Sequence, residues 1–258
     1  MKIIRFTHKK SDPQYGWIDK NHVGLFNKMP FGIYRRLEAF IPIEEIRMLS
    51  PVKPGKILGI GRNYPENAKE QKVEIPEVPM VFLKPPSAII GPDEAIHLPP
   101  QSQQVEFEAE LGVVISRQGR WIGMENVRDY ILGYTIINDV TARDLQQRDG
   151  QWTRSKGFDT FCPVGPWIET DMDVSDLLIT CRINDEIKQL SSTREMVFNI
   201  SQIIIYISSI MTLEPGDLIL TGTPAGVGVL KSGDKVEIEI EGIGILRNGV
   251  IEEDKARG

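Results

Sequence analysis

Hydrophobic residues fall mainly into short runs that are rich in β-branched side chains or alternate with polar residues, which is the pattern of β-strands. Two runs come early, at Lys2–Thr7 and Tyr15–Phe26, and the turn-prone pair Lys20-Asn21 interrupts the second. The remaining runs are Lys56–Gly61, Met80–Lys84, Val105–Arg117, Ile131–Val140, Leu177–Ile183 and Lys235–Ile240. Because these runs do not alternate regularly with helical segments, they predict an α+β fold with a dominant sheet.

Two segments have a helical pattern instead. A short helix is expected at Met124–Arg128. A longer one is expected from about Thr193 to Met211, where apolar residues recur every three or four positions. Ser192 and Glu195 have the Ser-x-x-Glu spacing of a capping box, which places the start of the longer helix there.

Proline and glycine interrupt both patterns at Leu49–Gly55. Strand-like runs lie on both sides of this interruption, and the part before it is too short to be the main domain. We therefore expect a small N-terminal subdomain at residues 1–50 and a larger domain at residues 51–258.

Composition and charge narrow the function classes. The 258 residues carry a net charge of −6, which argues against a nucleic-acid partner because such proteins usually have a basic stripe. The longest apolar stretches, such as Ile203–Ile207, are too short to cross a membrane, and no signal peptide is readable. The two cysteines give neither a disulfide framework nor a metal-finger spacing. A cytoplasmic globular protein is the expectation.

The segment Val105–Ile115 holds the strongest chemical signal. If it forms one strand, Glu106, Glu108 and Glu110 share a face, because alternate side chains point the same way. Carboxylates two residues apart start about 6.5–7 Å from one another at the backbone, so both can converge on one cation. A solvated outer face of an edge strand is the alternative.

A further carboxylate, that of Asp139, lies in an almost continuously apolar run, Ile131–Val140, which is expected to be buried on both faces. Burying Asp139 unpaired is too costly, so it should bind a metal or pair with a cation such as Arg143. With Glu108 and Glu110 it forms an all-oxygen set without a nearby cysteine or histidine. Such a set suits Mg²⁺, Mn²⁺ or Ca²⁺ better than zinc.

Several motifs together are similar to those of the fumarylacetoacetate hydrolase family, from about Lys56 to Ile251. They are Glu108-Ala-Glu110-Leu-Gly-Val-Val, Asn138-Asp139-Val-Thr-Ala-Arg143-Asp144-Leu-Gln146, Lys156-Gly-Phe-Asp-Thr-Phe, Thr221-Gly-Thr223-Pro-Ala-Gly-Val-Gly228, Gly61-Arg62-Asn63-Tyr64, Phe82-Leu-Lys84-Pro and Asn184-Asp-Glu186. The resemblance implies a mixed β-roll that usually dimerises. It also implies Mg²⁺, replaceable by Mn²⁺ or Ca²⁺, with Glu108, Glu110 and Asp139 as ligands. The implied substrates are small 2-oxo or 2-hydroxy-2-enoic acids.

The resemblance assigns further roles within the site. Lys156 and Thr223 are expected to hold the charge of a developing enolate, and Glu70 is the candidate base. The expected substrate-binding residues are Arg143, Gln146, Asn63, Tyr64 and Gly222. Three of these residues have a structural alternative. Arg143 and Gln146 could form a bridge to Asp144 or Asp139, and Lys156 could be an exposed loop lysine.

One position departs from the family pattern. Hydrolytic members often carry a histidine three residues before the glutamate that Glu70 matches, on a mobile lid, but here Asn67 occupies that position. An amide cannot take a proton at neutral pH, so activation of water is weakened. We therefore expect isomerisation or decarboxylation through a metal-held enolate, with hydroxyheptadienedioate or oxaloacetate as substrate. Hydrolysis of acylpyruvates or fumarylpyruvate is the alternative, and a metal-binding member without efficient turnover is the third possibility.

The segment from Tyr64 to about Val78 is expected to become ordered when substrate binds. The alternative is a helix that is permanently docked on the surface.

Overall fold

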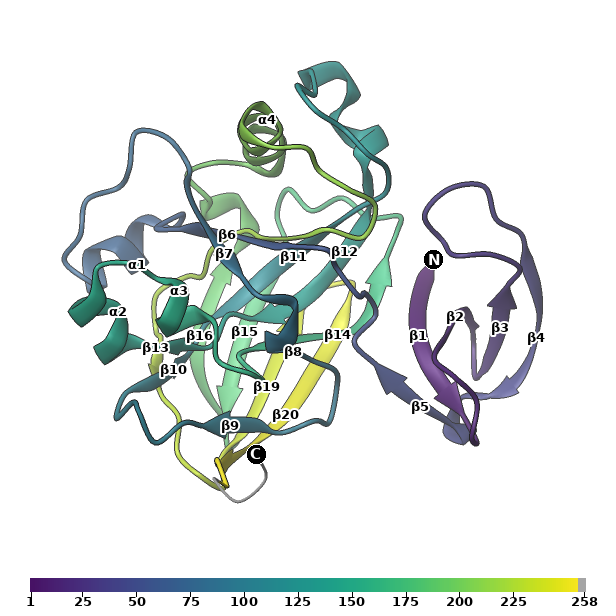
Figure 1. Cartoon of the computed structure of the whole chain (residues 1–258), viewed down its shortest axis with the longest axis horizontal. Helices are drawn as coiled ribbons and strands as arrows, with labels where there is room; N and C mark the ends of the chain where they lie inside the picture. The colour runs from purple at the N-terminus through teal and green to yellow at the C-terminus, as the bar shows by residue number, and fades with distance from the viewer. Residues whose placement is uncertain (255–258) are drawn as a thin grey trace.

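A mixed twelve-stranded sheet dominates the computed structural model, which describes residues 1–254 (Figure 1). Its strands run in the order β4-β3-β2-β1-β14-β12-β11-β17-β6-β7, and β5 and β8 pair with β1 and β14. Their bounds are β1 Lys2–His8, β2 Gln14–Asp19, β3 His22–Phe26, β4 Arg36–Pro42, β5 Ile46–Leu49, β6 Ile57–Gly61, β7 Met80–Lys84, β8 Ile89–Ile90, β11 Ala109–Ile115, β12 Ile131–Asn138, β14 Cys162–Glu169 and β17 Leu218–Leu220. The α+β class with a dominant sheet is confirmed.

Two smaller sheets complete the β-structure. A five-stranded sheet has the order β16-β15-β19-β20-β9, and a three-stranded sheet has the order β13-β10-β18. Their bounds are β9 Ile96–Leu98, β10 Val105–Phe107, β13 Thr141–Ala142, β15 Leu178–Ile183, β16 Glu186–Ser192, β18 Gly228–Val229, β19 Lys235–Ile240 and β20 Gly244–Glu252. Strands β19 and β20 pack against β12, so the main core lies between the two larger sheets.

Helices are short and lie at the periphery. The α-helices are α1 Pro65–Glu70, α2 Arg143–Asp149, α3 Thr153–Lys156 and α4 Ile200–Ile210, and the 3₁₀-helices are η1 Ile43–Glu45, η2 Pro86–Ala88, η3 Met124–Tyr130 and η4 Thr193–Glu195. The expected helix at Met124–Arg128 is therefore a 3₁₀-helix. No helix among the described residues is both long and apolar enough to cross a membrane.

The longer predicted helix begins seven residues later than expected, at Ile200. Ser192 caps the 3₁₀-turn η4 by accepting a hydrogen bond from Arg194 N. The capping box of α4 is made instead by Asn199 and Gln202, whose side chains each accept from the other's backbone N–H. The prediction was wrong because the Ser-x-x-Glu pattern marks a single turn that ends before the amphipathic helix starts.

The first five strands form a lobe at one side of the molecule, with its own small core around Phe6, Val23 and Ile41 (Figure 1). This lobe is joined to the rest through backbone pairing, because β1 lies antiparallel to β14 with Ile3 opposite Ile168. The expected larger domain, residues 51–258, includes residues 255–258, which lie outside the described part of the chain.

Candidate metal centre

A break in one strand brings the acidic residues together. The expected continuous strand Val105–Arg117 is wrong, since β10 ends at Phe107 and β11 begins at Ala109. At the break, Asn138 Oδ1 accepts from Glu108 N at 2.9 Å, and Asp139 N donates to Glu108 O at 2.8 Å. These two bonds replace the lost ladder partners of Glu108, because β10 leaves the large sheet and pairs with β13 and β18.

The break separates the three glutamates that the alternation had placed on one face. Glu106 belongs to β10 and accepts from Arg143 Nε at 2.7 Å. Glu108 and Glu110 converge on Asp139, and ligand oxygens of these three residues lie within 4.8 Å of one another. All three side chains are buried, which rules out a solvated outer face of a strand.

The donor set fits a hard divalent cation. It consists of carboxylate oxygens alone, the ligands that Mg²⁺ and Mn²⁺ prefer. The Glu110 carboxylate accepts a hydrogen bond from Gly222 N at 2.6 Å. Burial and the neighbouring charges of Asp139 and Glu108 raise the pKa of Glu110 well above its usual range. A cation bound between the three carboxylates would relieve this repulsion.

Basic side chains surround the other sides of the carboxylates. Lys156 Nζ donates to Glu108 Oε2 at 2.9 Å and to Asp139 Oδ2, and Lys84 Nζ donates to Asp139 Oδ1 at 2.7 Å. Arg143 also donates to Glu108 Oε1. Burial opposes the ionised form of Glu108, but Lys156 and Arg143 outweigh it and lower the pKa of that carboxyl to about 2. Burial likewise opposes the charge of Lys156, while Asp139 and Glu108 raise its pKa, so it stays an ammonium.

These contacts decide between the alternatives for the basic residues. Asp139 pairs with Lys84 and Lys156, so the alternative in which it pairs with Arg143 is wrong. Arg143 donates to Gln146 Oε1 at 2.6 Å, and it bridges Glu106 and Glu108 rather than Asp144 or Asp139. Lys156 is 2 % exposed and is not a loop lysine in solvent.

A small pocket of about 30 Å³ contains the carboxylates, with room for one or two water molecules. Residues expected in the site that line it are Glu108, Glu110, Asp139, Arg143, Gln146, Lys156 and Thr223. Asn67, at the position of the family's histidine, lines it too, together with Ile60, Gly61, Arg62, Gln71, Phe82 and Trp152, to which no role had been assigned.

Four expected site residues, Asn63, Tyr64, Glu70 and Gly222, do not line this pocket, and three of them form hydrogen bonds close to it. Asn63 donates to Phe198 O and Thr221 O at 3.0 and 2.7 Å, and Glu70 accepts from Gly226 N at 2.9 Å. Tyr64 is buried, and its hydroxyl has no hydrogen-bond partner among the described residues. The role of Gly222 is the backbone N–H that it directs at Glu110.

Two buried polar residues that we had not singled out hold the site in place. Lys84 also donates to Val140 O at 3.2 Å. Gln189, on β16, accepts from Ala109 N at 3.0 Å and donates to Thr223 Oγ1 at 2.9 Å. Lys84 could have been found from its motif, whereas Gln189 is a single amide in an otherwise exposed strand and gives no sequence signal.

Family models cover most of the chain. A model described as "Fumarylacetoacetate (FAA) hydrolase C-terminal" matches residues 56–251, and one described as "Rv2993c-like, N-terminal" matches residues 1–51. The mitochondrial oxaloacetate tautomerase Fahd2a of Rattus norvegicus is 44% identical over 223 residues, which cover 82% of this chain and 71% of that protein.

Two solved structures have the same fold. The 2-hydroxyhepta-2,4-diene-1,7-dioate isomerase of Mycobacterium marinum superposes with a TM-score of 0.90 at 42% identity, covering 99% of this chain and 100% of its own. A maleylpyruvate hydrolase from Sphingobium, solved with manganese(II) and pyruvate, gives a TM-score of 0.81 at 27% identity, covering 98% and 100%. The chain belongs to the fumarylacetoacetate hydrolase family.

Proposed function

We propose that this protein is a Mg²⁺-dependent enzyme that isomerises or decarboxylates small 2-oxo acids through an enolate. The observation that carries the proposal is the buried carboxylate set with an ammonium group, Lys156, in direct contact with two of its members. The similarity to an oxaloacetate tautomerase and to a dienedioate isomerase supports this class of substrate.

Glu108, Glu110 and Asp139 would hold the metal ion. Bound there, the ion would supply a Lewis acid for the 2-oxo group of the substrate. Mn²⁺ is the nearest substitute by ligand chemistry, and the Sphingobium neighbour was solved with manganese(II).

The protein's own groups would hold and orient the charge of the reaction. Lys156 remains protonated, so it serves as a fixed positive charge and hydrogen-bond donor to the enolate oxygen rather than as a base. Lys84 fixes Asp139 from the opposite side through Oδ1. Arg143 keeps Gln146 at the pocket wall, where the amide can orient a substrate carboxylate.

The two reactions make different demands on a base. Decarboxylation needs none, because the electron pair of the enolate comes from the broken bond to the carboxylate. Tautomerisation removes a proton from carbon, and the candidate base is Glu70 at the end of α1. The Glu70 carboxylate accepts a hydrogen bond from Gly226 N and does not line the metal pocket. Helix α1 would therefore have to shift for Glu70 to reach the substrate.

Hydrolysis of acylpyruvates is the second candidate, favoured by the similarity to the maleylpyruvate hydrolase. It requires a base for water, yet the side chain that faces the pocket from α1 is Asn67. The amide of Asn67 donates to Pro224 O at 3.3 Å and accepts from Gln71 Nε2 at 3.3 Å. Neither bond provides a proton acceptor for water.

The test compares oxaloacetate and acetylpyruvate with the same Mg²⁺-loaded preparation. We expect kcat/KM for oxaloacetate tautomerisation or decarboxylation to exceed that for acetylpyruvate hydrolysis by at least about tenfold. We also expect Asn67→His to raise hydrolysis, since general acid–base assistance is typically worth about 10²–10⁴-fold. Wild-type hydrolysis that is faster than both other reactions, and unchanged in Asn67→His, would reverse the order of the two functions.

A further inference from the structure

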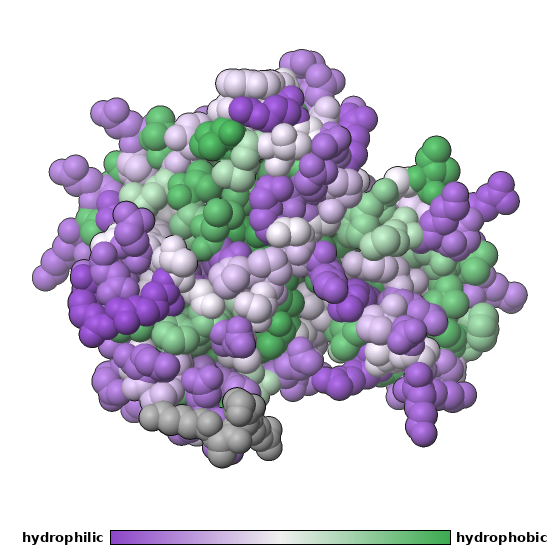
Figure 2. All heavy atoms as spheres, in the orientation of Figure 1, coloured by the Kyte–Doolittle hydropathy of each residue, from purple (hydrophilic) through white to green (hydrophobic). Residues whose placement is uncertain are grey.

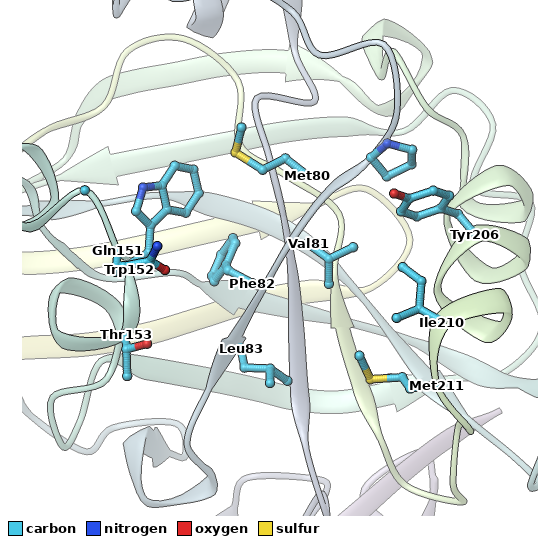
Figure 3. Close-up of a pocket in the computed structure, with 12 residues that line it drawn as sticks. Met80, Val81, Phe82, Leu83, Gln151, Trp152, Thr153, Tyr206, Ile210 and Met211 are labelled. Carbon is cyan, nitrogen blue, oxygen red and sulfur yellow. The ribbon is translucent and has the colours of Figure 1, made fainter.

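A largely apolar groove of about 580 Å³ lies next to the metal pocket (Figure 3). Strand β7, the last strand of the large sheet, runs along it between the C-terminal part of α4 on one side and Gln151–Thr153 on the other. In Figure 2, hydrophobic side chains gather on the surface between β7 and α4. Leu83 on β7 and Ile210 on α4 are 50% and 49% exposed.

None of the 12 residues that line this groove carries a formal charge at neutral pH. Met80, Val81, Leu83, Ile210 and Met211 contribute aliphatic and sulfur-containing side chains to its lining, and Gln151, Thr153 and Tyr206 contribute uncharged polar ones. The metal pocket, in contrast, is lined by six acidic or basic side chains, which are Arg62, Glu108, Glu110, Asp139, Arg143 and Lys156. The groove would therefore accept an apolar part of a ligand, and the metal pocket would accept a charged part.

Two aromatic rings, those of Phe82 and Trp152, line both cavities. Their centroids lie 5.2 Å apart at an interplanar angle of 61°. On the metal side, the Nζ of Lys156 lies 4.9 Å from the centroid of the Phe82 ring. The groove thus begins one ring away from the ammonium group that we place beside the enolate.

Glycines in β6 allow the rings to occupy this position. A Cβ atom at Gly59 would lie 2.1 Å from Phe82 Cζ, and one at Gly61 would lie 2.7 Å from Trp152 Cη2. Both rings therefore rest on strand backbone. Trp152 is half-buried and lies between α2 and α3, two residues after Gly150, whose left-handed φ of 70° ends α2.

The metal pocket, at about 30 Å³, is too small for more than the chelating head of a substrate. A longer substrate chain must extend out of this pocket. The groove beyond Phe82 and Trp152 adjoins the pocket and is large enough to hold such a chain. We propose that this groove binds the apolar chain of a 2-oxo acid whose head lies at the metal, with Phe82 and Trp152 as the gate between the two. This inference rests on the proposed function and narrows its substrate class.

The preferred substrate is then a 2-oxo acid with a hydrocarbon chain and no distal charge. A second carboxylate at the far end would enter a groove whose lining provides no cation to compensate the loss of its hydration. Oxaloacetate, which is short, would use the head site alone.

The test measures binding of 2-oxobutanoate, 2-oxohexanoate and 2-oxooctanoate to the Mg²⁺-loaded protein by calorimetry. We expect each added methylene to tighten binding about two- to fourfold, as for partial to full burial of a CH₂ group. We also expect 2-oxooctanedioate to bind at least about tenfold more weakly than 2-oxooctanoate.

A charge placed in the groove should reverse this preference. Ile210→Lys adds a cation at the end of α4, where it suits the helix dipole, and should favour 2-oxooctanedioate over 2-oxooctanoate. Binding of 2-oxobutanoate should stay unchanged. The matched control is Ile187→Lys on β16, which is 52% exposed and does not line the groove, and which should keep the wild-type preference.

The outcomes separate the two proposals. Failure of 2-oxobutanoate to bind the loaded wild type would contradict the proposed function itself. Equal affinities for all chain lengths, with 2-oxobutanoate bound, would overturn the groove assignment alone. The groove assignment would also be overturned if Ile210→Lys converted a dimer into monomers without changing the chain-length preference, because the groove would then be a contact between two copies of this chain.

Discussion

At the scale of single residues, the carboxylates of the metal site differ in the charged and polar groups that contact them. Asp139 lies between two buried ammonium groups, whereas Glu110 has a backbone N–H from Gly222 and two like charges. Removing charge from these two residues should therefore have opposite effects on the metal-free protein, although both substitutions remove a candidate metal ligand.

We expect Asp139→Asn to lower the free energy of unfolding of the metal-free protein by about 3–5 kcal/mol, because it leaves Lys84 and Lys156 without their shared counter-charge. The matched variant Glu110→Gln should be neutral or stabilising, because it relieves like-charge repulsion. Urea unfolding in EDTA measures both, and equal destabilisation by the two would contradict the charge arrangement.

At this scale, the sequence predicts the three candidate metal ligands but not the basic side chains that surround them. Glu108, Glu110 and Asp139 carry a signal because carboxylates in apolar runs need partners. Apart from its family motif, Lys84 has no comparable signal, because a lysine that ends an apolar run is normally exposed, and the fold turns it inward against Asp139. Lys156, between Ser155 and Gly157, has the sequence pattern of an exposed loop lysine.

At the scale of elements, half of the strands followed from periodicity. The run Val105–Arg117 alternates correctly, but nothing within it predicts that Asn138 will open the ladder at Glu108. Among the strands of six or more residues, β4, β14, β16 and β20 were missed. Many residues of β4, β16 and β20 are exposed and give no clear apolar face, whereas β14 is buried but contains two prolines and a glycine, which are typical of a turn.

The start of α4 gives a direct test at this scale. Asn199→Ala should lower the free energy of unfolding by about 0.5–2 kcal/mol, because it removes the side-chain acceptor of Gln202 N. Glu195→Ala, the control at the residue that sequence favoured, should change it by less than about 0.5 kcal/mol, since Glu195 pairs with Arg194 on the surface. A larger effect of Glu195→Ala would mean that the helix begins where the sequence placed it.

At the scale of the whole molecule, the small volume of the metal pocket requires a part of the protein to move when a substrate binds. Helix α1 contacts the loop after Thr221 through hydrogen bonds from Asn67 to Pro224 O and from Gly226 N to Glu70. Much of residues 72–78 is exposed, so few buried contacts hold the segment that follows α1. This favours opening on the α1 side rather than movement of the sheets.

We expect Mg²⁺ and oxalate together to slow amide hydrogen exchange in residues 65–71 at least about tenfold, because a ligand in the pocket fixes α1 over it. Helix α4, whose Ile203, Ile204 and Ile207 are fully buried, provides the internal control and should show little change. Equal exchange in α1 with and without the ligands would identify it as a permanently docked helix.

The most direct test of the central claim is the rate of oxaloacetate tautomerisation by EDTA-stripped protein during titration with Mg²⁺. We expect the stripped protein to show only the uncatalysed rate, Mg²⁺ or Mn²⁺ to restore activity, and Glu110→Gln to remain inactive at metal concentrations that saturate the wild type. Full activity in the stripped wild type, or metal-dependent activity in Glu110→Gln equal to that of the wild type, would contradict a metal centre built on Glu108, Glu110 and Asp139.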